Sequence, residues 1–138
     1  MKRLVMDCSV SASWFLRDET NEEAKKILSM VKDHEIVVPP LWPIEMANVL
    51  VMAERKKRIT AADAARVVEL FMDLPIEVEG GGLQNIRVLQ LLAREHGLTA
   101  YDACYLELAQ RRGLPLASLD QVLNQAAKKC GVPVLIGT

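Results

Sequence analysis

Short apolar runs, each suited to one buried β-strand, alternate along this chain with longer segments of helical periodicity. The runs occupy residues 4–6, 36–38, 115–118 and 134–136, and the alternating residues 76–79 are expected to form a short edge strand. Capping residues, prolines and glycines predict helices over about 10–16, from Thr20, over 43–57, from Thr60 to Pro75, and over 83–96, 99–112 and 120–130. Strands that alternate with helices form a mostly parallel sheet covered on both faces, so we expect an α/β fold with about five strands.

Four acidic residues stand where helices begin, close to the predicted ends of strands. Asp7 and Asp120 each follow a predicted strand, and Glu45 and Asp102 are expected in the first turns of their helices. Ligands of such sheets bind outside the carboxyl ends of the strands. We therefore expect the four carboxylates to converge in one crevice. Asp102 also has a simpler interpretation, in which it only helps Thr99 to cap a helix.

Carboxylates gathered in one crevice repel one another strongly unless a cation neutralises them. Carboxylate and water oxygens are the ligands that Mg²⁺ and Mn²⁺ prefer. A site without His or Cys matches the two-ion arrangement for phosphodiester hydrolysis, in which one ion activates water and the other stabilises the leaving oxygen. His34 and His96 are expected to be surface or capping residues. We therefore expect Mg²⁺ or Mn²⁺ as cofactor, bound as one or two ions.

Composition limits the location and the partners that we expect. With a net charge of −1, nucleic-acid binding must depend on local basic patches or on metal ions. The three cysteines fit neither a disulfide framework nor a zinc site, which indicates a reducing cytosol. No apolar run suits a signal peptide or a transmembrane helix. We expect a cytoplasmic protein without membrane contact, and the apolar share of 51% favours a face covered by a partner.

Four short segments place an acid beside apolar and hydroxyl residues. They are VMDCS at 5–9, PIEMAN at 43–48, TAYDA at 99–103 and SLD at 118–120. In this order and at this spacing they resemble the signature segments of PIN domains, and in particular those of VapC-like toxins of type II toxin–antitoxin systems. The resemblance covers the chain, and it implies a single PIN domain over residues 1–138 with a three-layer α/β/α sandwich. It also implies a metal-dependent endoribonuclease that leaves a 3′-hydroxyl and a 5′-phosphate, with these metal-binding acids: Asp7, Glu45, Asp102 and Asp120.

The resemblance implies further polar residues around the metal and the scissile phosphate. Ser9 and Ser118 would lie there, although their hydroxyls also suit helix caps or turns. Asn48, one turn after Glu45, could hydrogen-bond in the same pocket.

Basic residues near the crevice are the candidates for contact with an RNA substrate. Arg17 follows the first predicted helix, and Arg55, Lys56 and Arg58 belong to the one dense basic run. These cations also have a purely structural explanation, because positive charge at a helix C-terminus interacts favourably with the helix dipole.

VapC-like toxins pair with themselves and with an antitoxin, so the resemblance implies a homodimer and a cognate antitoxin. The candidate groove for the antitoxin is the apolar face around Trp14, Phe15, Val49 and Met52. Trp14 could instead stack on a base or pack in the core, whereas Trp42 and Tyr105 are expected in the core.

Other classes of protein fit the sequence less well or remain open. A phosphoaspartyl hydrolase needs a second Asp two residues after Asp7, where Ser9 stands. A receiver domain needs an acceptor Asp after the third strand and a Lys after a late strand, and neither is present. A PIN-like scaffold that binds RNA or protein without cleavage remains an alternative, although a decayed site would be expected to lose an acid. A housekeeping RNA-processing nuclease on the same fold is the other.

Overall fold

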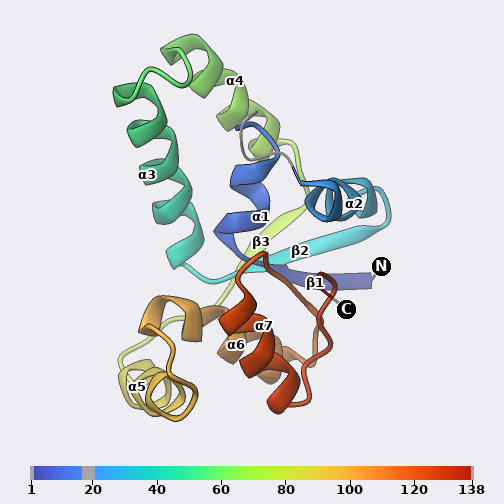
Figure 1. The fold of residues 1–138 in the computed structure, drawn as a ribbon, viewed down its shortest axis with the longest axis vertical. Helices are drawn as coiled ribbons and strands as arrows, with labels where there is room; N and C mark the ends of the chain where they lie inside the picture. Colours follow the sequence, from blue (N-terminus) through green and yellow to red (C-terminus); the bar gives the residue numbers. More distant parts are fainter. Residues whose placement is uncertain (1, 17–20, 138) are drawn as a thin grey trace.

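A parallel sheet lies between two layers of helices, with α1 to α4 on one side and α5 to α7 on the other (Figure 1). The computed structural model describes residues 2–16 and 21–137. Its strands are β1 (Lys2–Met6), β2 (His34–Val38), β3 (Ile76–Val78) and β4 (Leu116–Ala117). Its helices are α1 (Cys8–Ser13), α2 (Glu22–Met30), α3 (Leu41–Arg55), α4 (Ala61–Met72), α5 (Asn85–His96), α6 (Ala100–Arg112) and α7 (Gln121–Lys129). The expected α/β sandwich is confirmed.

The strands pair in the order β3-β2-β1-β4, and every pairing is parallel. The central strands end in fully apolar residues that are buried on both faces of the sheet, namely Leu4, Val5 and Met6 in β1 and Ile36, Val37 and Val38 in β2. Continuous apolar runs of this kind are typical of parallel strands under two helical layers. β3 is the edge strand that the alternation at 76–79 predicted.

The strand order reverses direction at β1. From β1 the chain moves outward through β2 to β3, and it then returns to place β4 on the other side of β1. The helices that follow β1 and β4 therefore leave the sheet on opposite faces and open a crevice outside the carboxyl ends of these two strands. This crevice is the position in the fold at which a ligand site is expected.

The sheet has four strands in the described residues, whereas the sequence indicated about five. The run at 134–136 forms only an isolated parallel bridge between Leu116 and Val134. The reason is that β4 is only two residues long. Pro115, before β4, has no N–H to donate, and Ser118, after it, hydrogen-bonds to Asp7. A further strand can therefore pair with β4 at a single residue.

Several helix starts differ from the sequence prediction by one or two residues. Helix α1 begins at Cys8 and not at Val10, and α5 begins at Asn85 and not at Leu83. The cap of α2 is Asn21, whose side chain accepts hydrogen bonds from the N–H groups of Glu23 and Ala24; Thr20 lies outside the described residues. Helix α3 begins at Leu41, because the chain already turns at Pro39, whose carbonyl accepts the N–H of Trp42. Glu45 therefore lies in the second turn of α3 and not in its first.

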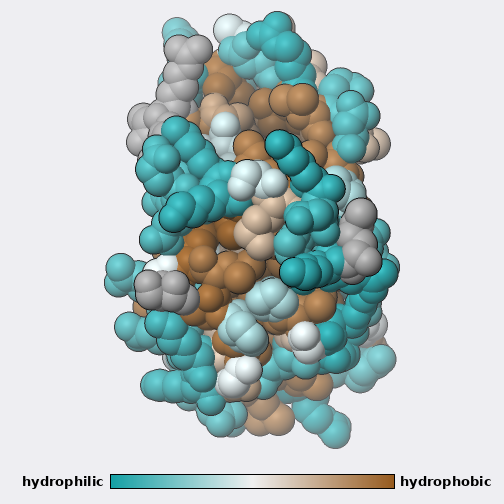
Figure 2. Space-filling view, turned by 90° about the vertical axis from the view of Figure 1, so that its right-hand side faces the viewer, coloured by the Kyte–Doolittle hydropathy of each residue, from teal (hydrophilic) through white to brown (hydrophobic). Residues whose placement is uncertain are grey.

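Apolar residues remain on the surface, as expected for a chain with this composition. Figure 2 shows one side of the molecule, on which brown apolar areas are interrupted by hydrophilic side chains. None of the helices in the described ranges combines the length and the apolar character that crossing a bilayer would require.

Candidate metal centre at the carboxyl edge of the sheet

Asp7 and Ser118 are neighbours because the strands before them pair in register. Met6 lies opposite Ala117, and the N–H of Asp7 donates to the carbonyl of Ala117 at 3.1 Å. Asp7 and Ser118, which follow these two residues, therefore lie next to each other. The Oγ of Ser118 donates to Oδ2 of Asp7 at 2.5 Å, and the Oγ of Ser9 donates to Oδ1 at 2.5 Å.

The carboxylate of Asp7 is buried, with only 5% of the residue exposed. Burial raises its pKa to about 6, because the charged form loses contact with water. Three donors oppose this effect, namely the hydroxyls of Ser118 and Ser9 and the N–H of Val10 at the start of α1. The negative charge of Asp102 raises the pKa further.

The turn between β4 and α7 is tied to the same group of hydroxyls. The Oγ of Ser9 accepts the N–H of Leu119, and the Oγ of Ser118 accepts the N–H of Asp120, each at 3.0 Å. Asp120 then caps α7, since its Oδ1 accepts the N–H of Leu123 at 3.1 Å. Within the described residues only Oδ1 is used in this way, so Oδ2 of Asp120 is available to a ligand.

Asp102 lies in the first turn of α6, whose cap is Thr99. The hydroxyl of Thr99 accepts the N–H of Asp102 at 3.1 Å. Burial and the negative charge of Asp120 raise the pKa of the Asp102 carboxyl, and the Thr99 hydroxyl opposes them. A carboxylate that served only as a cap would have its pKa lowered by backbone donors. The shift in the pKa of Asp102 is therefore opposite in direction to that expected of a purely capping acid.

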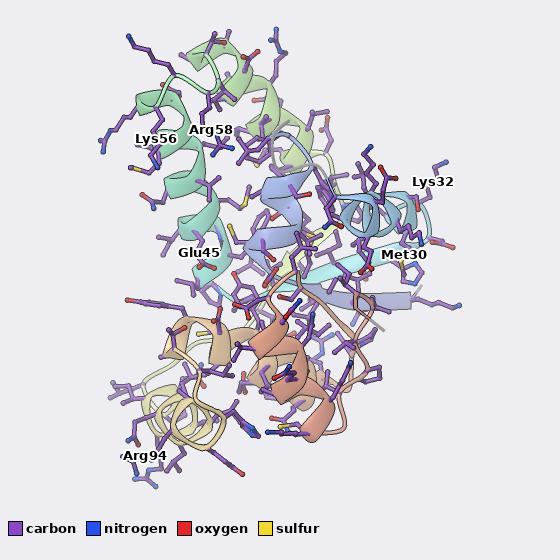
Figure 3. All side chains as sticks on the ribbon, in the orientation of Figure 1. Met30, Lys32, Glu45, Lys56, Arg58 and Arg94 are labelled. Carbon is purple, nitrogen blue, oxygen red and sulfur yellow. The ribbon has the colours of Figure 1, made fainter. Side chains whose placement is uncertain are left out.

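Glu45 reaches the same edge from α3, near the junction between the two helical layers (Figure 3). The hydroxyl of Tyr105, on α6, donates to Oε1 of Glu45. Burial and the charge of Asp102 raise the pKa of the Glu45 carboxyl, while this hydrogen bond lowers it.

Asp102 is thus the acid through which the set is electrostatically linked. Its charge acts on Asp7 and Glu45, and the charge of Asp120 acts on it. The four acids come from four parts of the fold, and Asp102 lies within electrostatic range of the other three. Among the described residues, however, no three His, Cys, Asp or Glu side chains are grouped closely enough to form a ready metal centre. Burial is the largest cause of the raised pKa of Asp7, Glu45 and Asp102, and repulsion between the acids adds to it.

The sequence prediction missed two residues that support this neighbourhood. Tyr105 was expected only in the core; it is buried, but its hydroxyl also positions Glu45. Asn124 is buried on α7, and its Nδ2 donates to the carbonyl of Ser118 at 2.9 Å, which fixes the turn before Asp120. The available signal was a polar group on an otherwise apolar helix face, since such groups usually have a buried hydrogen-bond partner.

The remaining polar candidates lie apart from this neighbourhood or outside the described residues. Asn48 is exposed one turn beyond Glu45 on α3. Arg55, Lys56 and Arg58 are exposed at the other end of α3, far from Glu45 (Figure 3). At 1.5 Å per residue, the helix separates Glu45 from Lys56 by roughly 16 Å along its axis. Arg17 lies outside the described residues.

A groove of about 710 Å³ lies beside the candidate apolar face. Its lining includes apolar Phe15, Ile59 and Val67 and the cations Arg58 and Arg66.

The other residues of the candidate face have different positions. Trp14 stacks near Phe71, with ring centroids 6.1 Å apart, and donates its Nε1–H to the carbonyl of Ala24. Trp14 is therefore part of the packing between helices. Val49 is half-buried, and Met52 is 37% exposed on α3.

Comparison with known proteins places this arrangement in a family. The family model described as the PIN domain matches residues 4–129. Ribonuclease VapC3 from Pyrobaculum aerophilum is 30% identical over 127 residues, which cover 89% of this chain and 93% of that protein. The crystal structure of PAE2754 from Pyrobaculum aerophilum shares the fold with a TM-score of 0.73 at 23% identity, covering 98% of this chain and 90% of that one. The crystal structure of VapBC2 from Rickettsia felis, bound to a DNA fragment from their promoter, has a TM-score of 0.62 at 9% identity, covering 96% of each chain. The chain therefore belongs to the PIN-domain family and is one of its VapC-like members.

Proposed function

We propose that this protein is an endoribonuclease that hydrolyses RNA phosphodiester bonds with Mg²⁺ or Mn²⁺. The observation that carries the proposal is the electrostatic linkage of Asp7, Glu45, Asp102 and Asp120 at the carboxyl edge of the sheet. The pKa is raised in three of them, so the folded chain holds more negative charge at this edge than it can solvate well. The name of its relative, Ribonuclease VapC3, supports RNA as the substrate.

The donor set fits a hard divalent cation. Every candidate ligand is a carboxylate oxygen, and Mg²⁺ usually keeps several of its waters when only a few carboxylates bind it. A closed set of protein ligands is therefore not required. When bound, the ion would supply activation of the attacking water and stabilisation of charge on the leaving oxygen.

The residues around the acids keep the carboxylates ionised and oriented. Ser9 and Ser118 donate to Asp7, which favours its charged form against the effect of burial. Tyr105 holds Glu45 through a neutral hydroxyl, and burial raises the pKa of that hydroxyl further, so Tyr105 adds no charge to the site. The backbone of α7 holds one oxygen of Asp120 and leaves the other for the ion.

We further propose that the protein is a toxin held inactive by an antitoxin, and that it forms a homodimer. The VapBC2 assembly supports a protein partner for chains of this fold. The groove is lined by apolar residues, including Phe15, Ile59 and Val67, and by Arg58, Arg66 and Asp63, of which Asp63 pairs with Arg66. The apolar part of this lining suits a partner segment that carries apolar side chains.

The test is cleavage of a mixed RNA pool by the purified, partner-free protein with Mg²⁺ or Mn²⁺, compared with EDTA. Asp120→Asn is the informative variant, because Asn also caps helices well and α7 is expected to remain intact. Cleavage that requires the metal and is lost in the variant would support the proposal. Cleavage that survives EDTA or the variant would contradict it. A folded wild-type protein that binds RNA but cleaves none would favour a binding scaffold instead.

A further inference from the structure

The chain has six aromatic residues, and five of them are wholly or partly buried. Trp14, Phe15 and Trp42 pack around Phe71 with ring centroids 5.5 to 6.3 Å apart, and Tyr105 is buried against Glu45. The sixth, Tyr101, is 65% exposed. The protein thus places one aromatic ring in solvent although its other rings pack in the interior.

Tyr101 lies directly before one of the four candidate acids. It precedes Asp102 in the first turn of α6, and it lies four residues before Tyr105 on the same helix face. The hydroxyl of Tyr105 reaches Glu45, and Tyr101 lies one helical turn before Tyr105 on α6. Ile44, which is 68% exposed, precedes Glu45 on α3. Exposed apolar side chains therefore adjoin two of the four acids.

A neutral aromatic ring at this position meets a specific need of the site. The acids repel the phosphates of RNA, and the net charge of the chain is −1, so overall charge contributes little to binding. Stacking of a base on an aromatic ring gives affinity without charge, and it tolerates any base because every base has a π-face.

We propose that Tyr101 stacks on an unpaired nucleobase of single-stranded RNA and so positions the neighbouring phosphate at the acids; this inference rests on the proposed ribonuclease function. Tyr101 is a positioning residue, because it acts through the placement of the substrate. It takes the role for which Trp14 was a sequence candidate, since the indole of Trp14 is engaged with Phe71 and Ala24.

The first measurement is binding of a single-stranded RNA that contains 2-aminopurine, in EDTA so that no cleavage is needed. Stacking on Tyr101 should quench the fluorescence of 2-aminopurine. Tyr101→Leu keeps an apolar side chain but removes the ring, and we expect it to lose the quenching and to weaken binding about tenfold or more. Tyr101→Phe keeps the ring and should behave like wild type.

The second measurement separates KM from kcat in metal-dependent cleavage. Tyr101→Leu should raise KM about tenfold with little change in kcat, because the acids are untouched. Ile86→Ala is the matched control, since Ile86 is also the second residue of its helix and is 67% exposed, and it should leave both constants unchanged.

The outcomes distinguish this inference from the proposed function. Equal binding, quenching and KM in wild type and Tyr101→Leu would overturn the inference even if the enzyme cleaves RNA. A defect in Tyr101→Phe as large as in Tyr101→Leu would also overturn it, because a hydroxyl contact would then replace stacking. Quenching that depends on the ring of Tyr101, in a wild-type protein that never cleaves, would support the stacking and reject the nuclease.

Discussion

Two helices of this protein begin with the same local pattern and have opposite electrostatics. Thr60 caps α4 with Asp63 three residues later, and Thr99 caps α6 with Asp102 three residues later. Asp63 completes a capping box, accepts the N–H of Thr60 and pairs with Arg66, and these contacts lower its pKa. Burial and a neighbouring acid raise the pKa of Asp102.

The difference shows that local sequence determines the cap, while the topology determines the electrostatic environment of the acid. Each threonine accepts the N–H of the acid three residues on, at 3.0 Å in α4 and 3.1 Å in α6. Of these two helices, only α6 starts at the edge where β1 and β4 end. Its acid therefore interacts electrostatically with Asp7 and Asp120, whereas Asp63 does not lie near them. A pattern of four residues cannot predict the electrostatic environment of Asp102, because the acids near it are distant in the sequence.

The largest expected effect is on RNA cleavage. Asp102→Asn should lower the rate more than about 100-fold, since losing an outer hydrogen-bond partner of a metal ligand already costs about 10- to 100-fold. Asp63→Asn makes the same change at the equivalent position of α4 and should leave the rate unchanged. Initial rates on one RNA at saturating Mg²⁺ measure the activity of both variants. Equal losses of rate in the two variants would contradict the view that Asp102 belongs to the active site while Asp63 only caps a helix.

The free energy of unfolding should change with pH in opposite directions for acids with a raised pKa, such as Asp7, and for acids with a lowered pKa, such as Asp63. The pKa of Asp7 is about 6 when folded, against an ordinary 3.8, so the folded chain binds this proton more tightly than the unfolded chain. Without metal, the free energy of unfolding should therefore fall by roughly 2 kcal/mol as pH rises from about 4 to about 6, and by roughly 3 kcal/mol over the whole titration. The raised pKa values of Glu45 and Asp102 act in the same direction. Asp63, with a lowered pKa, contributes stability that is present above its unfolded pKa and is lost as the pH falls through its folded one.

Denaturant unfolding from pH 4 to 8, in EDTA and in Mg²⁺, measures this effect. Asp7→Asn should abolish the loss attributed to Asp7 and raise stability at pH 8, because it removes a buried charge and Asn still caps α1. Added Mg²⁺ should restore stability to the wild-type protein at pH 8. A metal-free protein that becomes more stable between pH 4 and 6 would contradict the burial of negative charge at this edge.

A smaller effect is expected at the hydroxyls that hold Asp7. Ser118→Ala leaves an oxygen of Asp7 and the N–H of Asp120 without their partner, which should cost about 1–3 kcal/mol of stability and about tenfold in activity. Ser13→Ala is the matched control, because the hydroxyl of Ser13 is also buried but has no hydrogen-bond partner in the described part of the chain. Thermal unfolding and initial rates compare the two, and a similar small change in both would show that the Ser118 hydroxyl is not needed.

The smallest effect is expected at the distant end of α3. Replacing Arg55 and Lys56 by Gln should weaken RNA binding a few-fold. The slope of the logarithm of the binding constant against the logarithm of the salt concentration should become shallower by about 0.7 for each RNA phosphate that the variant no longer neutralises. Lys128→Gln with Lys129→Gln, at the end of α7, is the control for general charge. Binding measured at several salt concentrations tests the pair, and an unchanged slope would leave these cations with only their structural role.

Much of the fold could be predicted because strands and caps are local features. The buried runs of β1 and β2, the capping box at Thr60 and the cap at Thr99 all follow from short patterns. The sequence predicted a fifth strand at 134–136, and its absence could not be foreseen because it depends on the length of β4.

In the candidate site, too, some features follow from local sequence patterns and others depend on tertiary packing. The position of Asp7 beside Ser118 follows from two strands that end together. The contact of Tyr105 with Glu45 depends on how α6 packs against α3, which no local pattern encodes. Exposure likewise distinguishes Tyr101, which is 65% exposed, from Trp14, which packs against Phe71, and no local pattern predicts this difference.

The most direct test of the account is a titration of the EDTA-treated protein with Mn²⁺, followed by electron paramagnetic resonance. Wild type and Asp63→Asn should bind the same one or two ions, and Asp102→Asn should bind at least about tenfold more weakly. Circular dichroism of each variant would establish that the fold is retained. Absence of Mn²⁺ binding in the folded wild type, or equal binding in Asp102→Asn, would contradict the claim that the four acids form one metal centre.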